Sequence, residues 1–240
     1  MDLNSIPVFI ITRDRVSCLL RLIAWLEKIK MRNIWIIDNA SSYPPMLAYL
    51  RATPHHVIPL DINVGHFVPW AIPQLCSIME KTWYIVSDPD VVPDTHCPED
   101  AVERFVKLLI RHPGYAKAGF SLSIDDIPDH FLHKQQVIAW EKKFWKHEVE
   151  PGVFNADIDT TFAVYRPGVT QYCLGPALRT ASPYFCRHLP WYLHNDCLSQ
   201  EERYYRSRLK PGISNWNQEK SPRIDKTDEL HCCQDMSRLA

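Results

Sequence analysis

The feature that most constrains this chain is the alternation of strand and helix signals over its first ninety residues. Four short runs are apolar and rich in β-branched or aromatic side chains, a pattern typical of buried strands. These runs are 8–11, 34–37, 57–60 and 83–86. The segments between them carry helical periodicity or prolines, and helices that connect strands in this way leave the strands parallel. The sequence therefore predicts an α/β fold with a mostly parallel central sheet flanked by helices.

Local signals set the boundaries of the expected helices. Asp14 is placed to cap a helix whose apolar positions run from Val16 to Leu26. Segment 97–100 predicts the start of another helix, with Pro98 at its first position. Other helices are expected at 44–51, 135–146 and 199–208, and other strands at 115–122 and 160–165. An irregular aromatic stretch is expected at 182–196 and a polar tail after Trp216. No repeat or linker interrupts the chain, which indicates a single domain.

Composition excludes several classes of protein. Only seven glycines occur, no GxGxxG is present, and Gly114 and Gly119 have P-loop spacing without the Lys-Ser/Thr that must follow. A net charge of -1 gives no basic field for nucleic acid. Eight cysteines without a CxxC pair support neither a disulfide scaffold nor a zinc ribbon. No signal peptide or transmembrane stretch is evident, so we expect a cytoplasmic protein without a membrane span.

Polar side chains follow each of the four predicted strands. In parallel sheets, ligands bind at the carboxyl ends of the strands. The four groups are Thr12-Arg13-Asp14, Asp38-Asn39, Asp61 to His66 with Asn63 and Gly65, and Ser87 to Asp90. Each group alone also fits a turn or a helix cap. Together they predict a ligand site along one edge of the sheet.

Asp88-Pro89-Asp90 is the sharpest motif. Two carboxylates flank a stiff residue directly after an apolar strand. Mg²⁺ and Mn²⁺ favour carboxylate ligands together with substrate phosphates. A proline turn at the strand end is the simpler interpretation of such a motif in isolation. Because the chain has no glycine loop for phosphate, the motif favours a divalent metal that neutralises a diphosphate.

A second carboxylate pair opens the predicted strand at 160–165. Extended geometry would place Asp157 and Asp159 on one face and Ile158 on the other. One of the two could act as a general base, Asp159 being favoured over Asp157, although a solvated strand start also fits. His188 lies among aromatic residues. It could be a core residue, a third metal ligand or a phosphate donor.

In order along the chain, these motifs resemble family 2-type glycosyltransferases of the GT-A fold, of the kind found in polysaccharide biosynthesis. The resemblance runs over about residues 6–216. Its motifs are Ile10 to Arg15, Ile36 to Ser42, Asn63 to His66, Ser87 to Asp90, Asp157 to Pro167 and Arg187 to Tyr192. It implies a nucleotide-sugar half at about 1–95, an acceptor and catalytic half at about 96–216, and a tail at 217–240.

The resemblance also implies roles for individual residues. Asp88 and Asp90 would bind Mn²⁺ or Mg²⁺, with Asp88 also near the ribose and His188 near the metal or diphosphate. Asp159, or failing that Asp157, would be the base of an inverting transfer to a hydroxyl of a glycan or other acceptor. The nucleoside-diphosphate sugar would lie against Thr12, Arg13, Asp14, Asp38, Asn39, Asn63, Gly65 and Asp88.

Three other functions remain open from the sequence. A phosphohydrolase of the haloacid dehalogenase type fits the DxDx[T/V] pattern at both Asp88 and Asp157, although that family carries the motif on its first strand. A nucleotidyltransferase would need a glycine-rich basic stretch after the first strand, which is absent. A sugar-nucleotide-binding protein without transfer activity is the non-enzymatic alternative.

Overall fold

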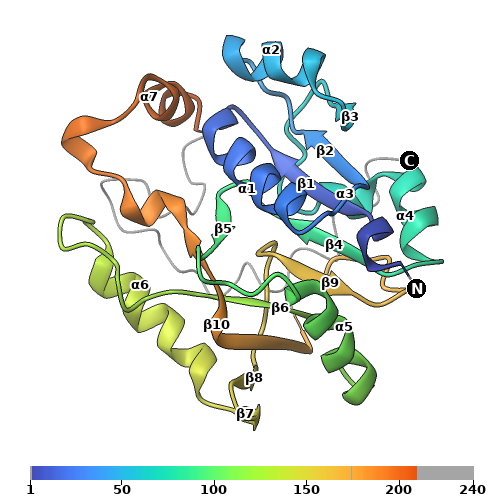
Figure 1. Cartoon of the computed structure of the whole chain (residues 1–240). Coiled ribbons are helices and arrows are strands. Elements are labelled where there is room, and N and C mark those ends of the chain that lie inside the picture. The colour runs from blue at the N-terminus through green and yellow to red at the C-terminus, as the bar shows by residue number, and fades with distance from the viewer. Residues whose placement is uncertain (1, 174, 210–240) are drawn as a thin grey trace.

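A mixed sheet of ten strands forms the centre of the computed structural model, which describes residues 2–173 and 175–209 (Figure 1). The predicted tail at 217–240 lies outside the described residues. In order across the sheet the strands are β3 (His56–Pro59), β2 (Ile34–Asp38), β1 (Val8–Thr12), β4 (Tyr84–Ser87), β9 (Ala163–Tyr165), β6 (Lys117–Leu122), β10 (Ala177–His188), β8 (Val153–Asn155) and β7 (Glu148–Glu150), and β5 (Val91–Pro93) pairs with β10.

The first four strands of this order are parallel, as the sequence predicts. β1 lies between β2 and β4, and β3 pairs with the outer edge of β2. Thr12 at the end of β1 is in register with Asp38 at the end of β2. The α/β fold class is therefore confirmed. The sheet is more mixed than expected, because β9 runs antiparallel between β4 and β6.

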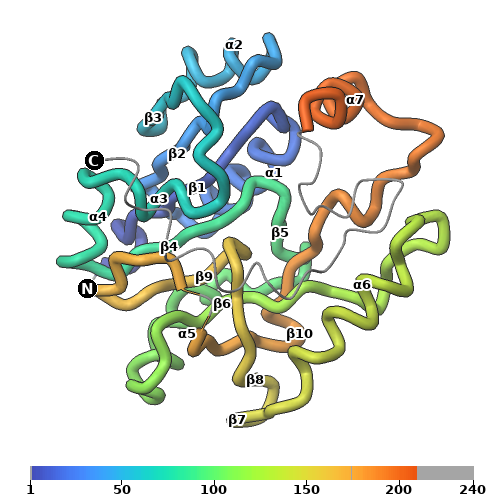
Figure 2. The backbone as a smooth tube through the Cα atoms, turned by 180° about the vertical axis from the view of Figure 1, so that it is seen from behind, coloured from blue at the N-terminus to red at the C-terminus, as the bar shows by residue number. Residues whose placement is uncertain are grey.

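Helices cover both faces of the sheet (Figures 1 and 2). α1 (Val16–Lys28) and α5 (Ala101–Arg111) pack on one face around Leu22, Phe105 and Phe120. α3 (Val68–Ala71) and α4 (Pro73–Met79) pack on the other face around Phe9 and Leu75. The remaining elements are α2 (Pro44–Ala52), α6 (Lys134–Glu141), α7 (Gln200–Ser207), η1 (Leu3–Ser5), η2 (Lys142–Trp145), η3 (Leu189–Tyr192) and η4 (Asn195–Cys197).

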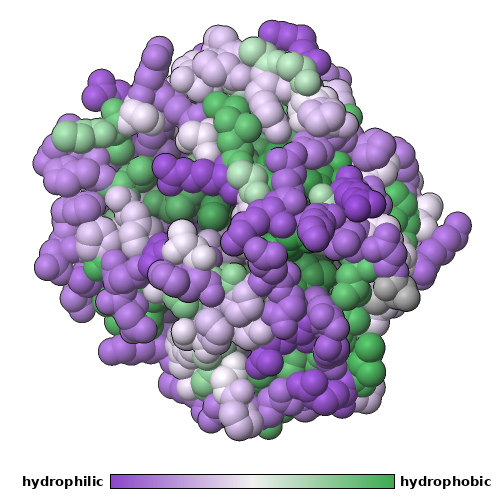
Figure 3. All heavy atoms as spheres, viewed as in Figure 1, coloured by the Kyte–Doolittle hydropathy of each residue, from purple (hydrophilic) through white to green (hydrophobic). Residues whose placement is uncertain are grey.

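The exterior shows no sign of a membrane-spanning element in the described part of the chain. None of the helices there combines the length and the apolar character needed to span a bilayer. On the face drawn in Figure 3, hydrophilic side chains dominate and apolar ones form small separate patches. Such scattered apolar side chains are normal on a protein surface.

Four local predictions need correction. α5 begins at Ala101 with Asp100 as its N-cap, so Pro98 lies outside the helix, after a turn closed by the Cys97 N–H on the Asp94 carbonyl. The stretch at 182–196 is not irregular throughout, since β10 continues to His188. The strand expected at 160–165 begins only at Ala163. Asp14 does not cap α1, whose N-cap is Arg15.

Candidate active site

The turns after β1, β2 and β3 are joined into one edge of the site by backbone and amide hydrogen bonds. Asn39 donates its N–H to the Thr12 carbonyl at 2.8 Å. Its side-chain amide bridges to the next turn, accepting from Val64 N at 2.8 Å and donating to the Gly65 carbonyl at 3.0 Å. Gly65 has a φ of +95°, which favours glycine at this position. Sequence reasoning brought these groups together correctly, and Asn39 acts as the brace between them.

Asp14 fixes the turn after β1 instead of capping the helix that follows. Its carboxylate is fully buried and accepts the N–H groups of Ser42 and Tyr43, at 2.6 and 2.8 Å. In return, Ser41 Oγ accepts the Asp14 N–H at 2.9 Å. These bonds link the β1–α1 and β2–α2 turns. Because Asp14 has no exposed surface, its contacts give it a structural role in holding the loop.

Several polar atoms on this edge are buried and lack a hydrogen-bond partner within the described residues. They are Thr12 Oγ1, Arg13 Nε and Asp14 Oδ2, of which the last two lie 3.8 Å apart as an ion pair. Asp38 lies beside them and is 5% exposed; burial raises its pKa, against the opposing effect of the Ser41 hydrogen bonds. Buried polar groups are usually satisfied, so unsatisfied ones at a strand edge indicate a place for a polar ligand.

The Asp88-Pro89-Asp90 motif forms the centre of the site, at the end of β4. Asp88 donates its N–H to the Thr160 carbonyl at 2.8 Å and accepts the Thr160 hydroxyl at 2.6 Å. Burial and the neighbouring Asp90 raise the pKa of Asp88 well above its usual value, Thr160 opposes this rise, and Asp159 adds to it. The two carboxylate motifs of the sequence therefore meet in space through Thr160.

Asp90 is 7% exposed and pairs with a cation that the sequence reasoning did not assign. Arg15 Nη1 donates to Asp90 Oδ2 at 2.7 Å. Burial lowers the pKa of Arg15, but Asp90, Tyr205 and Glu202 outweigh this effect and raise it overall. Arg15 belongs to the motif Ile10 to Arg15, directly after Asp14. The sequence does not indicate its pairing with Glu202, because the two residues are 187 positions apart in the chain.

The charge balance around the two aspartates leaves room for a cation. Arg15 is shared between Asp90 and Glu202, and Arg206 also pairs with Glu202, so two guanidinium groups face the three carboxyl groups of Asp88, Asp90 and Glu202. Among the described residues, no basic side chain forms an ion pair with Asp88. No preformed group of three His, Cys, Asp or Glu ligands is found in that part of the chain. Two carboxylates completed by substrate phosphates are a common way of holding Mg²⁺, and this donor set fits such an ion.

His188 lies at the edge of the same site, at the end of β10. Its Nε2 is 3.7 Å from Asp90 Oδ2, and its ring packs edge-on against Trp191. Nδ1 is buried without a hydrogen-bond partner in the described residues. Burial lowers the pKa of His188, although Asp90 opposes the change. A neutral imidazole beside a carboxylate could accept a metal or hydrogen-bond a phosphate.

The segment around Ile158 presents two carboxylates to solvent. Asp157 and Asp159 are exposed, whereas Ile158 between them is fully buried. The alternation expected for an extended chain is therefore present, although the segment precedes β9 and lies outside the ladder. Tyr172 donates its hydroxyl proton to Asp159 Oδ1 at 2.6 Å. This alternation is consistent with the expected placement of both carboxylates on one side of the segment, which stays a prediction together with their chemistry.

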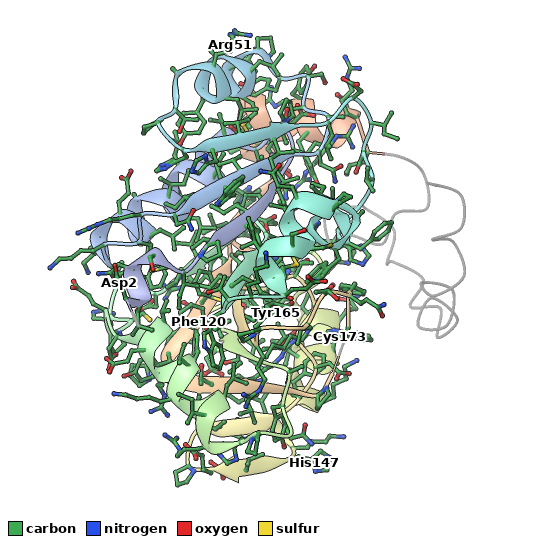
Figure 4. All side chains as sticks on the ribbon, turned by 90° about the vertical axis from the view of Figure 1, so that its right-hand side faces the viewer. Asp2, Arg51, Phe120, His147, Tyr165 and Cys173 are labelled. Atoms are coloured by element: carbon green, nitrogen blue, oxygen red, sulfur yellow. The ribbon has the colours of Figure 1, made fainter. Side chains whose placement is uncertain are left out.

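Two buried basic side chains, Lys117 and Arg179, bind the backbone carbonyls of the segment around Ile158. Lys117 is fully buried and donates from Nζ to the Ile158 carbonyl at 2.5 Å and to the Cys173 carbonyl. Arg179 Nε donates to the preceding carbonyl, that of Asp157, at 2.7 Å. Figure 4 labels Tyr165 and Cys173, which flank Lys117. A lone lysine in the otherwise apolar run at 115–122 was the sequence signal for this support, and it was missed.

A cleft of about 500 Å³ lies between the loop after β6, η2 and β10. Trp145 lines it, and the indole Nε1 of this residue is buried without a partner in the described residues. Arg187 lies at its edge, paired with Asp94 and Asp126, and precedes His188 in the chain. The cleft is lined by Ser123, Ile124, Asp125, Asp126, Lys142, Trp145, Ser182, Phe185 and Arg187.

Comparison with known proteins finds similarity among solved structures. No protein-family model matches the sequence, and no curated protein matches it. The structure is similar to that of the mannosyltransferase PcManGT from Pyrobaculum calidifontis, solved in complex with GDP-Man and Mn²⁺, with 10% sequence identity and a TM-score of 0.47. The similarity covers 76% of this chain and 56% of that chain, so this chain spans little more than half the length of that protein.

Proposed function

We propose that this chain is a metal-dependent glycosyltransferase, which moves a sugar from a nucleoside-diphosphate sugar to a hydroxyl group of a glycan or glycoconjugate acceptor. The observation that carries this proposal is the meeting of two carboxylate motifs at the end of the parallel strands. Asp88 and Asp90 form a site with unbalanced negative charge, and Thr160 connects it to the segment that carries Asp159. In this assignment residues 1–95 bind the nucleotide sugar and residues 96–216 bind the acceptor and supply the base.

The donor would lie along the edge formed by the turns after β1 to β4. Thr12 Oγ1 lacks a hydrogen-bond partner there among the described residues, Arg13 presents a partly exposed guanidinium beside Asp14, and Asp38 offers a carboxylate for a base or ribose. Asp88 and Asp90, with His188 beside them, would hold Mn²⁺ or Mg²⁺. When bound, such an ion offsets the charge that develops on a departing diphosphate.

Asp159 is the favoured general base. It is exposed, and its carboxylate adds to the field that acts on Asp88. The Tyr172 hydroxyl fixes the orientation of Asp159, and one carboxylate oxygen remains to take a proton from an attacking acceptor hydroxyl. Asp157 is the less favoured candidate. Thr160 bonds to Asp88, and Asp159 directly precedes Thr160, whereas Asp157 lies further back along the chain. Attack from the side opposite the diphosphate would invert the anomeric centre.

The cleft at Trp145 is the place proposed for the acceptor. It lies at the carboxyl end of β6 and against the second half of the parallel strand β10, and ligands gather at the carboxyl ends of parallel strands. The side chains of Trp145, two aspartates and a guanidinium line it. This combination suits the hydroxyl groups and apolar faces of a sugar.

Calorimetry with nucleoside-diphosphate sugars tests the donor site. Binding of a matching sugar nucleotide should require Mn²⁺ or Mg²⁺ in the wild-type protein and should be lost in Asp90→Ala. Unchanged binding by Asp90→Ala would exclude the metal role of that residue. Donor hydrolysis in the presence of Mn²⁺ separates a working transferase from a sugar-nucleotide-binding protein, and release of phosphate from a generic phosphomonoester would favour a phosphohydrolase instead.

A further inference from the structure

Arg15 connects the centre of the site to the last described helix. Its Nη1 donates to Asp90 Oδ2 at 2.7 Å. The other edge of the guanidinium faces Glu202 of α7, with Nε on Oε2 at 3.0 Å and Nη2 on Oε1 at 2.8 Å. Arg15, Asp90 and Glu202 are 4%, 7% and 5% exposed. A two-point pair of this kind fixes the plane of the guanidinium as well as its position.

α7 is anchored independently of this pair. Glu201 accepts the Ser17 N–H at 3.0 Å and the Ser17 hydroxyl. Tyr204 donates its hydroxyl to Ser42, with the carbonyl oxygen and the side-chain Oγ both at 3.0 Å. These contacts place α7 against the turns after β1 and β2 (Figure 1). Glu202 is therefore presented to Arg15 by a helix whose docking depends on several other residues.

We propose that Arg15 and Glu202 are positioning residues that hold Asp90 ready for a divalent cation. The inference rests on the proposed function, and it adds α7 to the residues on which the metal and diphosphate site depends. Glu202 occupies two of the guanidinium donors, so Arg15 reaches Asp90 through one nitrogen and one carboxylate oxygen. The second oxygen of Asp90 is thereby left for a cation.

Loss of Glu202 would change the site in two ways that act in the same direction. The freed guanidinium could turn its two-donor edge toward Asp90 and compete with the cation for both carboxylate oxygens. The site would also lose one negative charge close to the cation position. Arg206, which donates to Glu202 Oε1 at 2.8 Å, would lose the same partner. Both effects predict weaker binding of a divalent ion.

The test is Mn²⁺ binding by calorimetry in the absence and presence of a nucleoside diphosphate, with GDP and UDP tried in turn. Glu202→Gln should weaken Mn²⁺ binding about tenfold or more, the size usual for residues that orient metal ligands. Glu201→Gln is the matched control, because this neighbour on α7 docks the helix through Ser17 without touching Arg15. It should bind Mn²⁺ as the wild type does. Thermal unfolding of both variants reports whether α7 remains docked.

A double-mutant cycle that combines Glu202 with Arg15 gives a second measurement. Glu202→Gln should weaken Mn²⁺ binding much less in an Arg15→Met background than in the wild type, because only the direct loss of one negative charge remains once the guanidinium is gone. Equal Mn²⁺ affinities of Glu202→Gln and Glu201→Gln would exclude the positioning role and leave the proposed function intact. The same holds if the effects of Glu202→Gln and Arg15→Met on Mn²⁺ affinity simply add. Failure of the wild-type protein to bind Mn²⁺ under any of these conditions would instead overturn the metal-dependent function itself, and the positioning role with it.

Discussion

Lys117 donates a hydrogen bond from its buried ammonium group to the carbonyl oxygen of Ile158, at 2.5 Å. Ile158 is the residue between the two exposed aspartates, so a charge in the core of the sheet fixes the backbone that presents them. Burial lowers the pKa of Lys117 to about 8, although Cys173, Asp159 and Asp157 oppose the change. Support of the segment therefore depends on a group that changes its charge at mildly alkaline pH.

The Lys117→Met variant should alter how stability depends on pH. An unfolded chain has an ordinary lysine pKa near 10.4, so above about pH 8 it binds a proton that the folded protein has released. The contribution of Lys117 to the free energy of unfolding therefore rises with pH in this window. The wild type should gain about 2 kcal/mol relative to Lys117→Met between pH 7.5 and 9.5. Urea unfolding of both proteins at the two pH values measures this difference.

Comparison with the variant removes the effect of other groups that titrate in the same range. Cysteines and tyrosines whose pKa burial raises act in the opposite direction, but they are common to both proteins. A constant difference in stability between the two proteins across this pH range would show that Lys117 does not titrate there.

Substitution of the two exposed aspartates should separate their roles. Asp159→Asn should retain binding of the donor and lose about 10²- to 10⁴-fold in transfer, the usual contribution of a general base. Asp157→Asn keeps the same segment and the same exposure, and it should retain most of the activity. Steady-state transfer measured beside donor affinity by calorimetry checks both variants. The reverse order of effects would make Asp157 the base.

The carboxyl ends of the parallel strands were predictable because the information there is local. A short apolar run followed by polar residues defines a strand and its end, and the βα alternation then places four such ends along one edge. Thr12, Asp38 and Asp88 follow from this reasoning. The register of Thr12 with Asp38 and the bond from Asn39 to Gly65 show how closely the turns are joined.

Contacts between distant parts of the chain were not predictable in the same way. Glu202 reaches Arg15 across 187 positions, and nothing in the sequence of α7 distinguishes it from the neighbouring Glu201. The second half of the sheet was also harder to predict, because antiparallel strands such as β9 and β8 are three residues long and have no periodicity to read. Lys117 could have been found, since a charged residue inside an apolar run has to be paired or functional.

The proposed acceptor cleft predicts a selective change in kinetics. Trp145→Ala should raise the KM for the acceptor about tenfold and leave the affinity for the donor unchanged, because Trp145 lines the cleft away from the nucleotide edge. Trp140→Ala, in the same helical region, is the control, since Trp140 does not line the cleft. Initial rates at varied acceptor concentration distinguish the two. Equal effects of the two substitutions, or a loss of donor binding in Trp145→Ala, would count against the cleft as the acceptor site.

Gly119 should be the position in β6 least tolerant of a side chain. It pairs with Ala163 of β9, and a Cβ atom built at Gly119 would lie 2.2 Å from the Phe162 carbonyl oxygen and 2.7 Å from the Ala163 Cβ. Both neighbours belong to a buried backbone that cannot move aside without disturbing the segment from Thr160 onward. Gly119→Ala should therefore lower the free energy of unfolding by about 3 kcal/mol, at the upper end of the cost of overpacking a core.

Gly114→Ala is the matched control for this substitution, because, its chain neighbours aside, a Cβ atom at Gly114 would meet no atom of the described residues within 4 Å. It should change the free energy of unfolding by less than about 0.5 kcal/mol, as surface substitutions usually do. Gly119→Ala should in addition reduce transfer more than donor binding, since Phe162 and Ala163 follow directly on Asp159, Thr160 and Thr161. Chemical denaturation and donor calorimetry on both variants test this. Equal stability of the two proteins would mean that β6 and β9 lie further apart than the structure shows.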